Sequence, residues 1–268
     1  MSEVVQDVDV VQRTIEDGVA VLTLNRPDRL NAWTVEMESS YFGMLEECAG
    51  SAEVRVIIVT GAGRGFCAGA DMQDLQALGE GDVDVSAHAA ERRPQTFPLS
   101  IPKPIIAAVN GPCAGIGLVQ ALMCDLRFAA AGAKFTTAFA RRGLVAEHGI
   151  SWLLPRLVGP ERALDLLLSA RVVLAEEART LGLVNRVVAP DRLLEETLAY
   201  AHDLAASCSP ASMATMKRQV YADLQRDLPQ ALEEADRLML ESFGGADFVE
   251  GVTSFLERRT PRFAPLGG

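Results

Sequence analysis

The sequence predicts an α/β core followed by a helical C-terminal part. A pattern of strand, glycine turn and helix occurs twice, around residues 54–65 and again around 104–123. After about residue 149, apolar residues recur every three or four positions, which is the period of an amphipathic helix. We therefore expect a core over residues 1–199 and a helical region over residues 200–268.

The N-terminal end is expected to form two short strands and a helix. Apolar and polar residues alternate from Val8, and an apolar run over residues 19–24 follows the turn-forming pair Asp17-Gly18. A helix is predicted over residues 34–49, with the Thr34 hydroxyl as its N-terminal cap.

Each copy of the repeated pattern begins with a buried strand. Residues 54–60 are rich in β-branched side chains and run into a glycine turn. The second copy has a strand over residues 104–109, a buried helix over 118–123 and a further strand over 125–130. Between the copies, the polar, glycine-rich residues 79–90 predict a mobile loop.

Amphipathic helices are predicted in the C-terminal part of the chain. Apolar stripes run along residues 191–206, 229–242 and 248–255. Such faces on terminal helices commonly pack against another subunit, which favours a homo-oligomer.

The composition is that of a folded, acidic protein. Apolar residues make up 49% and charged residues 23% of the chain, and the formal net charge is −11. This charge argues against nucleic acid or a membrane as a partner. The five cysteines form no CxxC pair, and neither a signal peptide nor an apolar run of about 18 residues is visible. A cytoplasmic protein with reduced thiols is expected.

Other kinds of site match the sequence poorly. The glycines after residue 60 resemble a dinucleotide-binding turn, but the preceding strand is far from the N-terminus and no acidic strand end follows about 20 positions later. The nearest nucleophile elbow, around Ser151, lacks the closing glycine. His88, His148 and His202 form no HExxH motif, so we expect no metal. His88 and His202 are expected at the surface, and His148 either beside the pocket or in the core.

Two strand exits made of small residues remain, at residues 66–71 and 111–117. Small residues let a ligand approach the backbone and leave amide N–H groups without partners. Two such amides that face one another would form an oxyanion hole.

These segments resemble the crotonase family of enoyl-CoA hydratases and isomerases. The matching stretches include "LNRPDRLNAW" (24–33), "VIIVTGAGRGFCAGADM" (56–72), "IPKPIIAAVNGPCAGIG" (101–117) and "CDLRFAAAGAKF" (124–135). They occur in order over nearly the whole chain. The resemblance implies a superhelix of strand-strand-helix turns, with C-terminal helices that form a trimer or a dimer of trimers.

The resemblance also implies an acyl-CoA thioester substrate and a set of binding residues. The thioester oxygen would lie between the amides of Ala70 and Ile116. The pantetheine channel would be lined by the segment Ala68, Gly69, Ala70, Asp71, Met72 and Gln73. Arg26 and Arg29 would bind the nucleotide end of coenzyme A. No separate cofactor is implied, because coenzyme A is part of the substrate.

The chain departs from the family at the two glutamates that hydratases use. Val119 and Phe139 occupy those positions, and neither side chain can transfer a proton. Glu147 matches instead the single acid of family members that shift a double bond. One carboxylate in a dry pocket suffices for that reaction, because it removes a proton from C2 and returns it to C4.

The leading hypothesis is therefore an enoyl-CoA isomerase with Glu147 as the proton shuttle. A hydratase that adds water to a 2-enoyl-CoA is the first alternative, and it would need Glu147 to serve both proton-transfer roles. A catalytically silent acyl-CoA-binding homologue is the second alternative, and a hydride-transfer enzyme is the most distant one.

Overall fold

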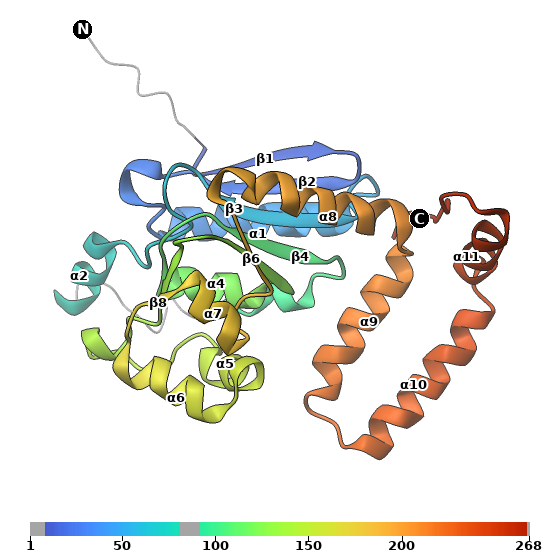
Figure 1. The fold of residues 1–268 in the computed structure, drawn as a ribbon. Helices are drawn as coiled ribbons and strands as arrows, with labels where there is room; N and C mark the ends of the chain where they lie inside the picture. Colours follow the sequence, from blue (N-terminus) through green and yellow to red (C-terminus); the bar gives the residue numbers. More distant parts are fainter. Residues whose placement is uncertain (1–8, 81–91, 267–268) are drawn as a thin grey trace, which may run out of the picture.

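A six-stranded sheet forms the centre of the computed structural model, which describes residues 9–80 and 92–266 (Figure 1). The strand order is β1-β2-β3-β4-β6-β9, and every neighbouring pair is parallel except β1 with β2. The strands are β1 (Val11–Glu16), β2 (Val19–Leu24), β3 (Val56–Gly61), β4 (Ile105–Val109), β6 (Leu126–Ala130) and β9 (Arg186–Val188).

The β1–β2 hairpin turns at Asp17 and Gly18, as predicted. Both residues have positive φ angles, 46° and 82°, which is the geometry of the tight turns that suit the twist of a hairpin. The turn pairs Glu16 with Val19 and sets the register of the whole hairpin. Apolar side chains of β2 consequently face the core, where Leu22 and Leu24 are fully buried.

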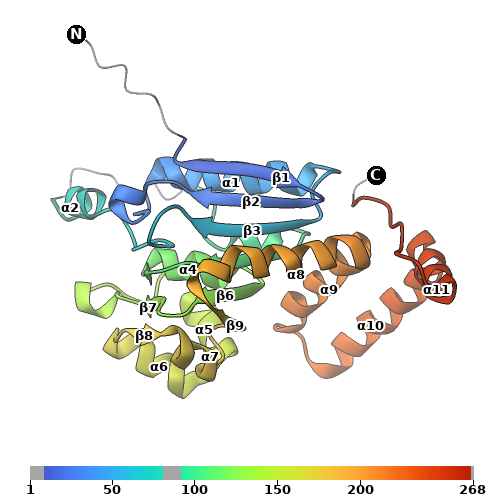
Figure 2. The ribbon, with the colours of Figure 1, turned by 45° about the horizontal axis from the view of Figure 1, so that its top comes forward.

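Helices cover both faces of the sheet (Figure 2). On one face pack α1 (Val35–Gly50) and α4 (Ile116–Met123), and on the other lies α8 (Leu193–Ser207). Successive residues of β3 alternate between the two layers: Ile57 faces the α1 side and Ile58 the α8 side. The predicted cap of α1 is confirmed, because the Thr34 hydroxyl accepts a hydrogen bond from the Met37 amide at 3.2 Å.

A second layer lies below the carboxyl ends of β3 and β4. A three-stranded sheet has the order β5-β7-β8, formed by β5 (Cys113–Ala114), β7 (Lys134–Thr136) and β8 (Val173–Leu174). The remaining helices of the core are α2 (Met72–Glu80), α5 (Ile150–Val158), α6 (Pro160–Ser169) and α7 (Ala175–Leu181). The 3-10 turns are η1 (Pro27–Arg29), η2 (Phe97–Ser100), η3 (Ala140–Arg142) and η4 (Pro190–Arg192).

Three C-terminal helices project from the core (Figure 1). They are α9 (Pro210–Asp223), α10 (Leu228–Phe243) and α11 (Ala246–Glu257). Lys217 of α9 contacts Asp125 at 2.8 Å, and the same carboxylate accepts hydrogen bonds from the Ile105 amide and the Tyr221 hydroxyl. Large apolar side chains of α10 and α11 are exposed, among them Leu228, Leu240, Phe243, Phe255 and Leu256. The trimer or dimer of trimers stays a prediction.

Two predicted boundaries fall within helices of the structure. Residue 200 lies inside α8, which packs along its length on the sheet, so the projecting helices begin at α9. Residues 79 and 80 belong to α2, and the rest of the loop predicted over 79–90 lies outside the described residues.

Four of the five cysteines are buried thiols. All five are free, and Cys48, Cys67, Cys113 and Cys124 are buried, whereas Cys208 is half-buried. Burial raises the pKa of the Cys67 and Cys124 thiols to about 12. Among the described residues, no helix combines the length and the apolar character that a membrane span requires.

Candidate active site

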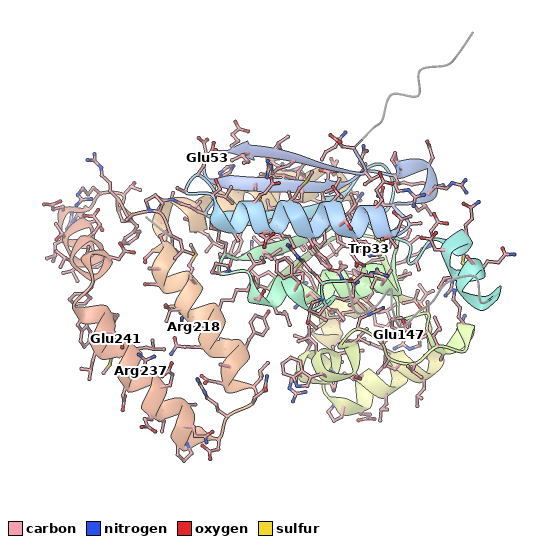
Figure 3. The ribbon with its side chains drawn as sticks, turned by 180° about the vertical axis from the view of Figure 1, so that it is seen from behind. Trp33, Glu53, Glu147, Arg218, Arg237 and Glu241 are labelled. Carbon is pink, nitrogen blue, oxygen red and sulfur yellow. The ribbon has the colours of Figure 1, made fainter. Side chains whose placement is uncertain are left out.

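A cavity of about 850 Å³ lies at the end of the molecule away from α9–α11, near Trp33 and Glu147 (Figure 3). Five stretches of chain supply its lining: the segment from η1 to the start of α1, the exit of β3 with α2, residues 92–95, the start of α4, and residues 138–148. A cavity of this size accommodates a small-molecule ligand.

The two small-residue strand exits predicted from the sequence lie side by side at this cavity. Cys67 and Cys113 form a parallel bridge, and the Ala114 amide donates to the Cys67 carbonyl at 3.0 Å. A Cβ atom on Gly117 would lie 2.3 Å from that same carbonyl oxygen, so only glycine fits there. Gly69 has a φ of 113°, which favours glycine over residues with a side chain.

Each strand exit carries a backbone amide without a partner at the cavity wall. The Trp33 amide donates to the Gly69 carbonyl, and the Trp33 carbonyl accepts from the Asp71 amide. The Ala70 amide, which lies between these two hydrogen bonds, takes part in neither of them. Ile116 is the first residue of α4, where backbone N–H groups have no partner within the helix. Within residues 9–80 and 92–266 neither amide donates a hydrogen bond, and both residues line the cavity. Two free donors at one wall can stabilise a negatively charged oxygen.

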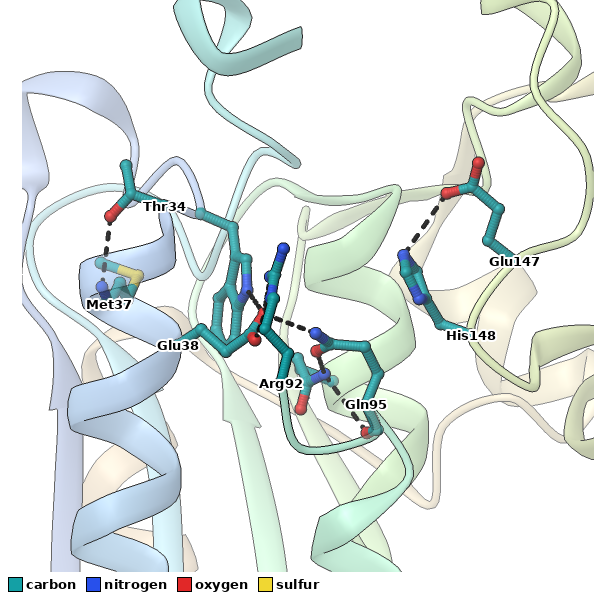
Figure 4. A network of polar contacts seen from close by, with 9 residues as sticks. Thr34, Met37, Glu38, Arg92, Gln95, Glu147 and His148 are labelled. Atoms are coloured by element: carbon teal, nitrogen blue, oxygen red, sulfur yellow. Dashed lines mark hydrogen bonds and ion pairs between the residues drawn. The ribbon is translucent and has the colours of Figure 1, made fainter. Parts of the chain in front are cut away.

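Glu147 and His148 line the same cavity from the loop before α5 (Figure 4). Their side chains are 31% and 39% exposed, and the His148 Nε2 atom lies 3.4 Å from a Glu147 carboxylate oxygen. Adjacent side chains usually point apart, but His148 has a φ of 57° and Gly149 a φ of 82°. The left-handed backbone at His148 costs about 1–2 kcal/mol. Burial lowers the pKa of His148 from 6.5, although the charges of Glu147 and Glu38 act in the opposite direction.

A buried carboxylate, Glu38 of α1, stands across the cavity wall from this pair (Figure 4). Its side chain accepts hydrogen bonds from Arg92 at 2.7 Å, from Gln95, and from the Trp33 indole at 3.2 Å. Burial alone would raise the pKa of Glu38, but these hydrogen bonds outweigh burial and lower the pKa below 4.5. Gln120 extends the network by donating to Gln95 at 2.7 Å. Arg92 and Gln95 both line the cavity.

A family model described as enoyl-CoA hydratase/isomerase matches residues 14–265 of this chain. The chain belongs to the enoyl-CoA hydratase/isomerase family. The predicted crotonase fold is confirmed by a probable enoyl-CoA hydratase/isomerase from Mycobacterium abscessus. That crystal structure superposes with a TM-score of 0.84 at 32% identity, covering 98% of this chain and 100% of the other.

Some relatives of this chain are named hydratases and another is named an isomerase. A probable enoyl-CoA hydratase from Rhodobacter capsulatus is 39% identical over 253 residues, covering 94% of this chain and 97% of that protein. A 1,2-epoxyphenylacetyl-CoA isomerase from Escherichia coli K12 is 37% identical over 253 residues, covering 93% and 96%. Both alignments span nearly the full length of each protein.

Most of the residues predicted to bind substrate lie at the cavity of this family member. Its lining includes the predicted Ala68, Gly69, Ala70, Asp71, Met72, Arg29, Ile116, Phe139 and Glu147. Gln73 is not among the lining residues, and its amide instead donates to the Asp71 carboxylate at the start of α2. Val119 is fully buried behind the wall, so Phe139 alone of the two replaced positions borders the cavity.

The guanidinium of Arg26, predicted to bind the nucleotide end of coenzyme A, is engaged within the protein. It contacts the Asp71 carboxylate at 3.0 Å and donates to the Ala32 carbonyl at 2.6 Å. The cavity lining does not include Arg26, whereas Arg29, three residues later, belongs to it. Arg26 therefore holds the segment before α1 against the β3 exit.

Two features of the site were not predicted from the sequence: the contacts of Glu38 and the left-handed backbone at His148. Glu38 precedes Tyr41 and Phe42 by three and four positions, so it lies on the apolar stripe of α1, and a carboxylate on such a stripe signals a buried polar contact. The left-handed backbone at His148 had no comparable signal in the sequence.

Proposed function

We propose that this protein acts on enoyl-CoA thioesters and shifts their double bond through an enolate intermediate. The observation that carries the proposal is Glu147, a carboxylate at the cavity wall, in a chain where Val119 and Phe139 replace the hydratase glutamates. Asp71 also lines the cavity, but it is engaged by Arg26 and by the start of α2.

The proposed reaction moves one proton and no other group. The Glu147 carboxylate takes a proton from C2 of a 3-enoyl thioester, and the electron pair spreads over the thioester carbonyl and the double bond. The amides of Ala70 and Ile116 donate to the thioester oxygen, which carries the developing charge. Glu147 then returns the proton to C4, which yields the 2-enoyl thioester and restores the carboxylate.

The test is the isomerisation of a 3-enoyl-CoA by the Glu147→Gln variant. Loss of a positioned general base lowers kcat by about 10²–10⁴-fold. The exposed Glu53 lies away from the cavity and provides the matched control, because Glu53→Gln removes the same charge and should keep full activity. Full turnover by the Glu147→Gln protein would refute the proposed role.

Hydration of a 2-enoyl-CoA is the second candidate reaction. It is favoured by the relative from Rhodobacter capsulatus, which is named a probable enoyl-CoA hydratase. Rates of water addition and of double-bond isomerisation on thioesters of the same chain length separate the two. Isomerisation faster than hydration supports our proposal, and the reverse order supports the hydratase.

A further inference from the structure

The loop before α5 turns two consecutive ionisable side chains toward one cavity. In regular backbone, neighbouring side chains point away from each other. Here the φ of 57° at His148 reverses the chain locally, so that the imidazole returns to within 3.4 Å of the Glu147 carboxylate.

The surrounding contacts hold this loop in place. The Ile150 amide donates to the Glu147 carbonyl at 3.1 Å and begins α5. A Cβ atom on Gly149 would lie 3.0 Å from a methyl carbon of Thr96, so the turn packs closely against the segment that carries Gln95. An energetically unfavourable backbone that is fixed on both sides in a candidate active site is a reason to look for a role.

We propose that His148 is a positioning residue for Glu147, whose imidazole donates its Nε2 hydrogen to one carboxylate oxygen. The other oxygen then stays directed at the substrate as the base. The inference rests on the proposed function, because it gives Glu147 the proton-transfer step. The Nε2–oxygen distance of 3.4 Å is long for a hydrogen bond, and such contacts commonly shorten when substrate is bound.

The role requires a neutral imidazole. Burial favours the neutral form and lowers the pKa of His148, and the nearby Arg92 acts in the same direction. Glu147 and Glu38 favour the charged form, and Arg142 of η3 lines the same cavity. A proton added to the imidazole would place a positive charge beside the base and weaken it, so the rate should fall on the acid side as His148 takes up a proton.

Two substitutions at His148 separate positioning from a purely structural role. His148→Ala removes the donor, and we expect kcat to fall about 10- to 100-fold with KM changed by less than about 2-fold. His148→Gln places an amide N–H near the Nε2 position without a titrating group. It should recover kcat to within a few-fold of wild type, while the acid limb of its pH–kcat profile moves to lower pH. His202→Gln, in α8, is the control.

The Glu147→Gln background tests whether the two residues act together. If His148 works through Glu147, adding His148→Ala to that background should change the residual rate by less than about 2-fold. Full kcat in the His148→Ala protein would overturn the inference. The inference would also be overturned if the His148→Gln protein had as low a kcat as His148→Ala and kept the acid limb of the wild-type pH–kcat profile. Full activity of Glu147→Gln would refute the proposed function instead.

Discussion

The carboxylate of Glu38 and the guanidinium of Arg92 form an ion pair inside the cavity wall, joining α1 to the segment before η2 across 54 positions of sequence. Glu38 is 3% exposed and Arg92 is partly solvated. The pair therefore fixes the wall that faces Glu147 and His148 (Figure 4).

The first prediction concerns the stability that this pair provides. Glu38→Gln leaves Arg92 without its charged partner, and we expect the free energy of unfolding near neutral pH to fall by about 1–3 kcal/mol. Because the folded-state pKa of Glu38 lies below its ordinary value of 4.5, the stabilisation is complete above that value and is lost as the pH falls through the folded pKa. Urea unfolding of both proteins at a series of pH values measures this free energy.

The stability gap between wild type and Glu38→Gln should thus narrow on acidification. The exposed Glu36, in the first turn of α1, provides the control, since Glu36→Gln should cost no more than about 0.5 kcal/mol. A difference in unfolding free energy that stays constant down to acid pH would contradict a lowered pKa at Glu38.

The second prediction concerns the contact between the two strand exits. Gly117→Ala would bring a methyl group within 2.3 Å of the Cys67 carbonyl, so the backbone must shift beside the Ala70 and Ile116 amides. We expect a loss of about 1–3 kcal/mol in stability and a fall in kcat of about 10²-fold or more. Steady-state kinetics and thermal unfolding measure both.

Gly43 gives the matched control, because a Cβ atom there meets nothing within 4 Å in the middle of α1. Gly43→Ala should stabilise the protein by about 0.5–1 kcal/mol and leave kcat unchanged. Normal turnover by Gly117→Ala would show that the amides do not depend on this close approach.

The third prediction separates the two arginines assigned to coenzyme A. Arg29 lines the cavity, so Arg29→Gln should raise KM for an enoyl-CoA about 5-fold, equivalent to about 1 kcal/mol. The increase should vanish with a pantetheine thioester, which lacks the nucleotide. Arg26→Gln should instead lower the melting temperature, since its guanidinium holds Asp71 and the Ala32 carbonyl. An Arg26→Gln protein with normal stability and a nucleotide-dependent rise in KM would reverse this assignment.

Regular elements and the strand exits could be predicted because their signals are local. The β-branched run before Gly61, the apolar strand before Asn110 and the hydroxyl of Thr34 each determine backbone conformation through their immediate neighbours. The resemblance then indicated the order of the elements and the position of Glu147.

The contacts that complete the site depend on tertiary packing, so their partners could not be read from the local sequence, even where, as at Glu38, the position on a helix indicated burial. The ion pair of Glu38 joins residues far apart in sequence, and Gly149, which follows the left-handed His148, packs closely against Thr96 of a different segment. Arg26 illustrates the same limit, because the resemblance implied a ligand contact but did not indicate the ion pair with Asp71.

Because four of the thiols are buried, the rate at which a reagent modifies them reports how often the folded core opens. Four cysteines have no route to reagent in the folded core, and their raised pKa values keep them protonated and unreactive. An alkylating probe should therefore reach Cys208 first and modify the others only as fast as the sheet and its covering helices separate. Substrate bound in the cavity against Ala68 and Gly115, which lie close to Cys67 and Cys113 in the sequence, would slow that second phase. The rate of alkylation would then measure ligand occupancy without any turnover.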